Sequence, residues 1–149
     1  RLMLMFLVFG IERFFGNVLT LIFLGDRLEK MIGKFRFILI YFLGGLAGNL
    51  LSLAKEMITG NYAISAGASG AIFAVVGALV FLVVRHRGKL PGTSGQRLAV
   101  MALLTLADGF VSTGVDYMAH LGGMAAGFVL AAILVGRRKL KVVPSFPEE

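Results

Sequence analysis

Residues 35–54 have the sequence FRFILIYFLGGLAGNLLSLA, in which Arg36 is the single charged residue. A helix needs roughly 20 apolar residues to cross the hydrocarbon core of a bilayer, and this stretch has that length. Its glycines, Gly44, Gly45 and Gly48, are the small residues that let membrane helices pack closely. The stretch therefore predicts a membrane-spanning helix that contacts other helices through its glycines.

The whole chain has the composition of a membrane protein. Of its 149 residues, 58% are hydrophobic and 15% are charged, and the mean hydropathy is +0.88. A soluble domain carries about 45–50% apolar and about 25% charged residues, so this balance excludes an ordinary soluble domain. The absence of cysteine excludes disulfides, thiol catalysis and cysteine-ligated zinc. Because the chain also has only two histidines, we expect no metal or other cofactor.

Further apolar tracts predict an all-α, polytopic membrane protein, a helix bundle with about five spans. We expect residues 2–11 to lie near the membrane surface. A membrane domain at residues 1–136 is expected to precede a tail at residues 137–149. The expected spans cover residues 13–24, with a continuation through residue 29, and residues 35–54, 69–84, 98–110 and 118–135.

Positive charge is distributed unevenly between the two sides of the predicted bundle. Twelve of the 15 Lys and Arg residues follow the first, third and fifth spans, whereas Arg1, Arg13 and Lys55 fall on the other side. Cytoplasmic loops of membrane proteins carry an excess of Lys and Arg. The C-terminal tail is therefore predicted to be cytoplasmic, with the polar loops at 55–66 and 109–117 outside. The net charge of +7 then reflects topology, and we expect no nucleic-acid partner.

Polar residues inside predicted spans are costly and mark candidate functional sites. Ser69 lies in Gly67-Ala68-Ser69-Gly70 at the outer end of the third span, and His120 lies at the outer end of the last one. A histidine beside a serine can take the hydroxyl proton and return it to a leaving amine, the minimum for nucleophilic catalysis. The alternative is structural, with Ser69 in helix packing and His120 hydrogen-bonded to a neighbouring helix.

Small residues follow His120 at helical spacing. In the stretch 119–127, AHLGGMAAG, Gly123 and Gly127 share the face of His120. This face predicts the close approach of another helix. Asn17 and Arg13, one turn apart in the first span, are the other polar candidates within the membrane.

Taken together and in order, these motifs resemble the signature of the rhomboid family of intramembrane serine proteases. The resemblance covers residues 1–136 and matches the second to sixth helices of a six-helix core, so we expect the chain to lack the first helix. The residues that carry it are Gly67-Ala68-Ser69-Gly70, His120 with its glycines, Asn17, Gly25-x-x-x-Glu29, Gly33-x-x-Arg36-Phe37 and Tyr41.

The resemblance implies a Ser–His dyad without an acid. Ser69 would be the nucleophile, and His120 the general base and then the general acid. An oxyanion hole would be formed by the Ser69 N–H, the Asn17 side chain and a donor four residues before Asn17. The residues implied to support the dyad are Gly67, Phe73 packed on the imidazole, and Gly123 and Gly127 at the contact between the two catalytic helices.

The chain departs from the family pattern at the donor four residues before Asn17, where Arg13 stands in place of a histidine. Arginine also donates hydrogen bonds, but it is longer and permanently charged, and it can extend to the outer membrane surface. Arg13 therefore either serves the oxyanion hole with altered geometry or only marks the membrane interface.

The expected function is the hydrolysis of peptide bonds in or near transmembrane segments of other membrane proteins, within the lipid bilayer. Two alternatives remain. A rhomboid-like protein that binds membrane clients without cleaving them is favoured only by the change at Arg13. A small channel or transporter subunit would show ionisable residues along a path through the membrane, whereas the polar groups here cluster near one side.

Overall fold

The computed structural model describes residues 11–12, 14–60, 68–87, 89–90, 93–94, 100, 103–104, 107 and 117–136. Residues 14–20 are helical and run directly into the first named element. The named elements are the π-helix η1 (Leu21–Gly25), α2 (Asp26–Ile32), α3 (Lys34–Thr59), α4 (Ala68–Arg85), β1 (Lys89–Leu90), β2 (Thr93–Ser94) and α6 (Tyr117–Leu134). The helical fold class expected from the sequence is confirmed.

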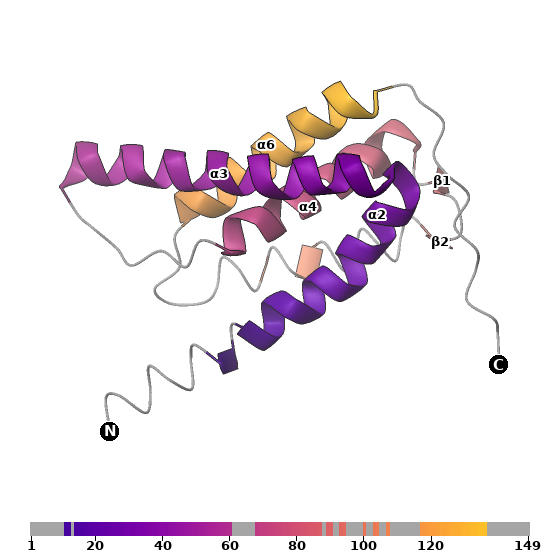
Figure 1. Ribbon diagram of the computed structural model, residues 1–149, viewed down its shortest axis with the longest axis horizontal. Coiled ribbons are helices and arrows are strands. Elements are labelled where there is room, and N and C mark those ends of the chain that lie inside the picture. Colours follow the sequence, from indigo (N-terminus) through magenta and orange to yellow (C-terminus); the bar gives the residue numbers. More distant parts are fainter. Residues whose placement is uncertain are drawn as a thin grey trace.

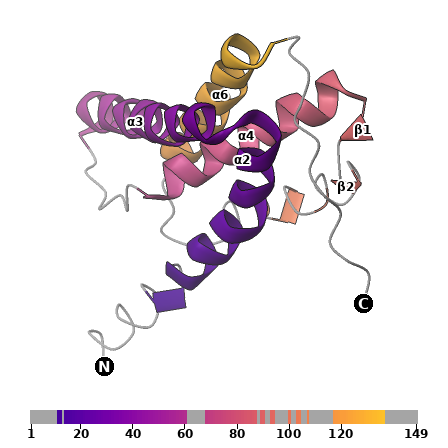
Figure 2. The ribbon, with the colours of Figure 1, turned by 45° about the vertical axis from the view of Figure 1, so that its right-hand side comes forward.

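Helix α4 is the central element of the bundle. It packs against both α3 and α6, which also contact each other, and η1 contacts it as well (Figures 1 and 2). Residues 70–79 of α4 are all buried. A helix that is apolar on every side belongs in the interior, and the sequence of α4 is of that kind. The segment 14–32 meets α3 at one end and diverges from it toward residue 14 (Figure 1).

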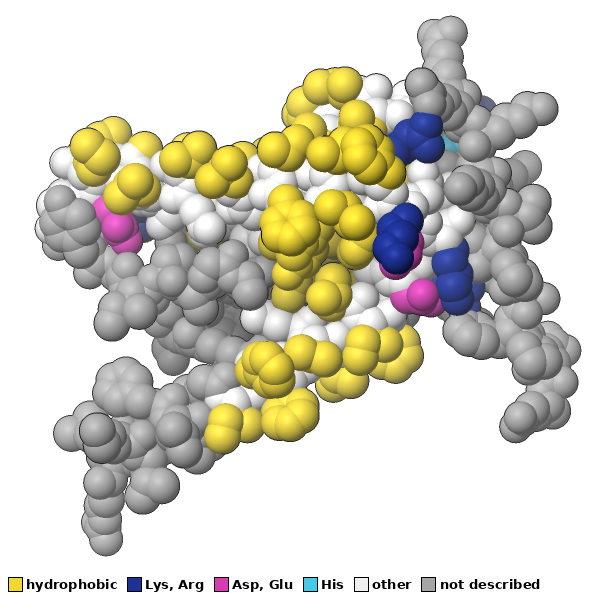
Figure 3. Space-filling view, in the orientation of Figure 1, with side chains coloured by type: hydrophobic (Ala, Val, Ile, Leu, Met, Phe, Trp, Pro, Cys, Tyr) yellow, Lys and Arg dark blue, Asp and Glu magenta, His cyan; other side chains and the backbone are white. Residues whose placement is uncertain are grey.

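The outer surface of the bundle is unusually apolar. Large hydrophobic side chains cover the face shown in Figure 3, and the basic side chains gather at one end. Phe35 is 74% exposed, and Ile58 is 85% exposed. Contiguous apolar surface of this kind marks contact with a membrane or a partner, and here it agrees with helices that face lipid.

Two glycines set the limits of α3. Gly33 alone separates α2 from α3. Its φ is +95°, a backbone conformation that residues other than glycine rarely adopt. At the other end, Gly60 has φ of +71°, and its N–H donates to the Glu56 carbonyl at 2.8 Å, which closes the helix. The expected span at 35–54 and polar loop from residue 55 are corrected accordingly: the helix continues through Thr59, because Lys55, Glu56 and Met57 form helices readily.

Span lengths differ along the chain. Among the described residues, α3 is the one helix long and apolar enough to cross a membrane, with a mean hydropathy of 1.9. The apolar helices Gly70–Arg85 and Met118–Leu134 are shorter. The expected span at 98–110 lies mostly outside the described residues, which include residues 100, 103–104 and 107 of it, and residues 1–10 and the tail at 137–149 lie wholly outside them. Between the expected spans at 69–84 and 98–110, Lys89–Leu90 pairs antiparallel with Thr93–Ser94.

Candidate active site

His120 lies in the first turn of α6 and is only 5% exposed. Its imidazole stacks on the ring of Phe73 from α4, with the two ring centroids 4.1 Å apart and the two planes 10° apart. Phe73 is itself buried. The stacking holds the plane of the imidazole against α4, which limits the ring to a narrow range of orientations.

Ser69 belongs to the first turn of α4, which begins at Ala68. Phe73 follows Ser69 by four residues, and residues four apart lie on the same face of a helix. The face of α4 that holds Phe73 against His120 therefore includes position 69, one turn nearer the start of the helix. The Ser69 side chain and Gly67 lie outside the described part of the structure.

Glycines bring the backbones of α4 and α6 into contact. A Cβ atom on Gly123 would overlap the carbonyl oxygen of Gly70, and one on Gly127 would overlap that of Ala74. This is the close approach that the spacing of Gly123 and Gly127 predicts. Because Gly70 follows Ser69 directly, the contact holds the serine end of α4 against the histidine end of α6.

The sequence predicted that α3 contacts other helices through its glycines, but it did not indicate which helix Gly48 would meet. A Cβ atom on Gly48 would lie 2.6 Å from the carbonyl oxygen of Ala119, which precedes His120. Ser52, one turn further along α3, is 4% exposed. The sequence feature that indicates this close packing is a set of small residues spaced by four, at Gly44, Gly48 and Ser52. These residues let α3 pack closely beside the turn that carries His120.

Asn17 is half-buried in the helical segment 14–20, and Arg13 lies outside the described residues. Along the long axis of the molecule, Figure 1 shows this segment at the same end as the starts of α4 and α6. Within the described ranges, no group of three His, Asp or Glu side chains is arranged to hold a metal ion.

The exposed hydrophobic side chains and the apolar helices are those expected of a helical membrane protein. The chain matches the rhomboid domain over residues 2–137, and it belongs to the rhomboid family. This confirms the resemblance that its motifs indicate.

Several curated relatives are similar over most of the chain. It is 37% identical over 125 residues to rhomboid protease GluP of Bacillus subtilis (strain 168), which covers 84% of this chain and 24% of that protein. It is 35% identical over 135 residues to RHOMBOID-like protein 2 of Arabidopsis thaliana, covering 89% and 41% of the two chains. RHOMBOID-like protein 1 of the same plant is 34% identical over 130 residues, covering 86% and 32%. The chain thus spans less than half the length of each of these relatives. No solved structure matches it.

Proposed function

We propose that the chain is the catalytic part of a serine protease that cleaves peptide bonds in or near transmembrane segments of other membrane proteins. The observation that carries the proposal is the stack of His120 on Phe73, one helical turn from Ser69. Membership of the rhomboid family, and a relative named as a rhomboid protease, support the same activity.

In the proposed mechanism, His120 takes the proton of the Ser69 hydroxyl as the oxygen attacks the scissile carbonyl carbon. The carbonyl oxygen becomes an oxyanion, and the Ser69 N–H and the Asn17 side chain donate hydrogen bonds to it. His120 then gives its proton to the leaving amine as the peptide C–N bond breaks, which leaves an acyl group on Ser69. A water molecule, deprotonated by His120, releases that acyl group and restores the serine.

The substrate class follows from the surroundings of the dyad. Peptide bonds of a membrane helix are protected by their own hydrogen bonds and by the absence of water. A site at the end of an apolar bundle suits a substrate helix that unwinds at the edge of the membrane, where water is available.

A fluorophosphonate probe tests the proposal directly, because it reacts with an activated serine hydroxyl. We expect the folded protein to be labelled at Ser69 and the Ser69→Ala variant to remain unlabelled. Ser94→Ala, which changes a serine in β2, is the matched control and should be labelled like the unchanged protein. A folded protein that takes up no probe would contradict the proposal and favour a rhomboid-like protein that binds clients without cleaving them.

The oxyanion donors are expected to contribute unequally. Asn17 is short and sits in a helix, whereas Arg13 must order a long side chain that has a well-solvated alternative at the membrane surface. Loss of a working oxyanion donor lowers the rate by about 10²–10³-fold. We therefore expect Asn17→Ala to cost more than Arg13→Ala, and Arg13→His to raise the cleavage rate.

Rates of these three variants on one substrate, at matched concentrations of folded protein, check this prediction. If Arg13→Ala loses as much as Asn17→Ala and Arg13→His gains nothing, Arg13 is itself an oxyanion donor.

The orientation in the membrane is proposed from the distribution of charge. Tags after residue 137 and in the basic loop at 85–97 should be cytoplasmic, and a tag at Gly60 should be outside, because Lys and Arg are retained on the cytoplasmic side. Labelling with a membrane-impermeant reagent in intact cells measures this. The reverse pattern would refute both the orientation and access to Ser69 from outside.

A further inference from the structure

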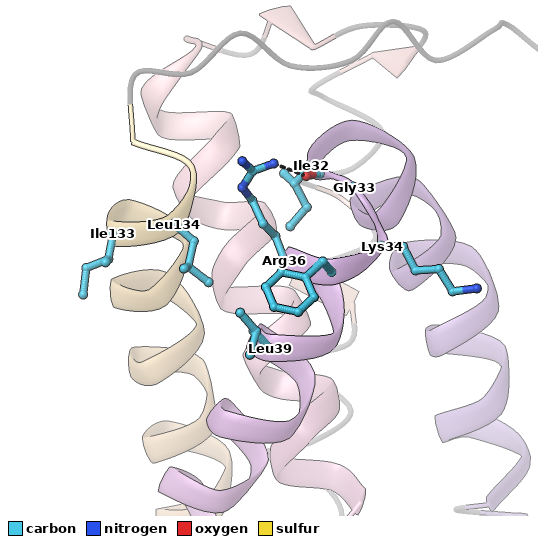
Figure 4. Close-up of a pocket in the computed structure, with 8 residues that line it drawn as sticks. Ile32, Gly33, Lys34, Arg36, Leu39, Ile133 and Leu134 are labelled. Atoms are coloured by element: carbon cyan, nitrogen blue, oxygen red, sulfur yellow. Dashed lines mark hydrogen bonds between the residues drawn. The ribbon is translucent and has the colours of Figure 1, made fainter.

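A pocket at the end of α6 lies far from the proposed dyad. A pocket of about 480 Å³ opens between the start of α3 and the end of α6 (Figure 4). Leu134, in its lining, comes fourteen residues after His120, which is roughly 21 Å along α6. The proposed protease mechanism does not use this pocket.

The lining combines apolar walls with positive charge. Leu39, Ile133 and Leu134 contribute apolar surface, and Lys34 and Arg36 are the charged lining residues. None of the described residues that line the pocket is acidic. The pocket is therefore complementary to a ligand that carries both an anionic group and hydrocarbon.

Arg36 is held in place for such a ligand. Its Nη1 donates a hydrogen bond to the Ile32 carbonyl at 3.1 Å. Figure 4 shows the Arg36 side chain rising from α3 beside Ile32, whereas Lys34 points away from it. A guanidinium carries five N–H donors in a fixed fork that matches phosphate, and this bond anchors the group with one of them. An anchored side chain loses less freedom when a ligand binds.

The pocket adjoins the apolar outer surface of the bundle. Phe35 and Ile133, which also line it, are 74% and 72% exposed, so the walls continue into the apolar outer surface. Lys30 and Arg85 lie at the same end of the molecule, because α2 and α4 end there (Figure 1), but neither lines the pocket, and Lys30 is paired with Asp26 at 3.0 Å. Basic pockets between membrane helices are suited to the headgroups of anionic lipids.

We propose that this pocket binds an anionic phospholipid of the adjoining leaflet. Its phosphate lies on the Arg36 guanidinium, and an acyl chain runs over Leu39 and Ile133. The apolar walls favour a lipid over free phosphate, and the positive charge favours an anionic lipid over a zwitterionic one. The proposal concerns lipid binding and stands whether or not the chain is a protease.

The test measures binding to the purified protein in detergent micelles. Phosphatidylglycerol is titrated in, and the shift of the unfolding temperature gives an apparent dissociation constant. We expect Arg36→Gln to weaken this binding by about tenfold or more, because hydrogen bonds to charged groups are strong. Arg85→Gln removes the same charge at the same end, from outside the pocket, and should bind like the unchanged protein.

Arg36→Gln also loses the hydrogen bond to the Ile32 carbonyl. A second variant therefore tests the pocket without removing that bond. Leu39→Trp fills the cavity without altering charge, and it should likewise lose the stabilisation by phosphatidylglycerol. Phosphatidylcholine and inorganic phosphate should each stabilise the protein much less. The proposal is overturned if Leu39→Trp or folded Arg36→Gln binds as tightly as Arg85→Gln. It is also overturned if either control ligand stabilises as well as phosphatidylglycerol.

Discussion

Replacing Ser69 or His120 with alanine is expected to lower cleavage of a membrane substrate by roughly 10⁴-fold or more. In the proposed dyad the nucleophile and the base would act as one unit, so removing either would leave only the catalysis that comes from binding and from the oxyanion donors. The two single variants should therefore be about equally inactive, and the double variant should be little worse than either. The measurement is the initial rate of cleavage of one transmembrane substrate at equal concentrations of folded enzyme.

The chain offers a matched control for the histidine. His86 is its other histidine and lies just beyond α4, whereas Ser69 is in the first turn of that helix. His86→Ala should retain cleavage, and thermal unfolding should show that His120→Ala remains folded. Persistent cleavage by folded Ser69→Ala or His120→Ala would refute the assignment of the dyad.

Replacing Gly127 with valine is expected to destabilise the bundle by about 3 kcal/mol or more. Its Cβ would overlap the carbonyl oxygen, carbonyl carbon and Cα of Ala74. Backbone atoms of the central helix cannot move aside as a side chain can, so α6 must shift away from α4. Overpacking typically costs about 1–3 kcal/mol, and a clash with backbone belongs at the upper end. The shift would also carry His120 away from Ser69, so cleavage should fall together with stability.

Gly16→Ala provides the comparison, since no atom of the described residues lies within 4 Å of a Cβ at that position. There we expect stability to be unchanged, or raised by up to about 1 kcal/mol because alanine favours a helix. Chemical or thermal unfolding in one detergent measures both variants. A Gly127→Val protein as stable as Gly16→Ala would show that α4 and α6 do not meet at this glycine.

Within the candidate site, the residues differ in how far the sequence could place them. The contact of Phe73 with His120 was implied by the family resemblance, and the spacing of Gly123 and Gly127 predicted a close helix contact. The sequence predicted a close helix contact at Gly48, but not that its partner would be Ala119. This contact joins residues about 70 positions apart, and no local pattern says which two small faces will meet.

The sequence by itself determined the membrane class, the helical fold and the order of the motifs. Hydrophobicity over some 20 residues and the side on which Lys and Arg gather are local properties. Only the tertiary structure decided that α4 is central, that Gly48 and Gly70 flank the start of α6, and that Arg36 faces a pocket. Lipid and protein interior are both apolar, so a membrane helix has little contrast between its buried and its exposed side. The choice of contacting faces therefore depends on the fit of small residues between helices, which exists only once the helices are packed.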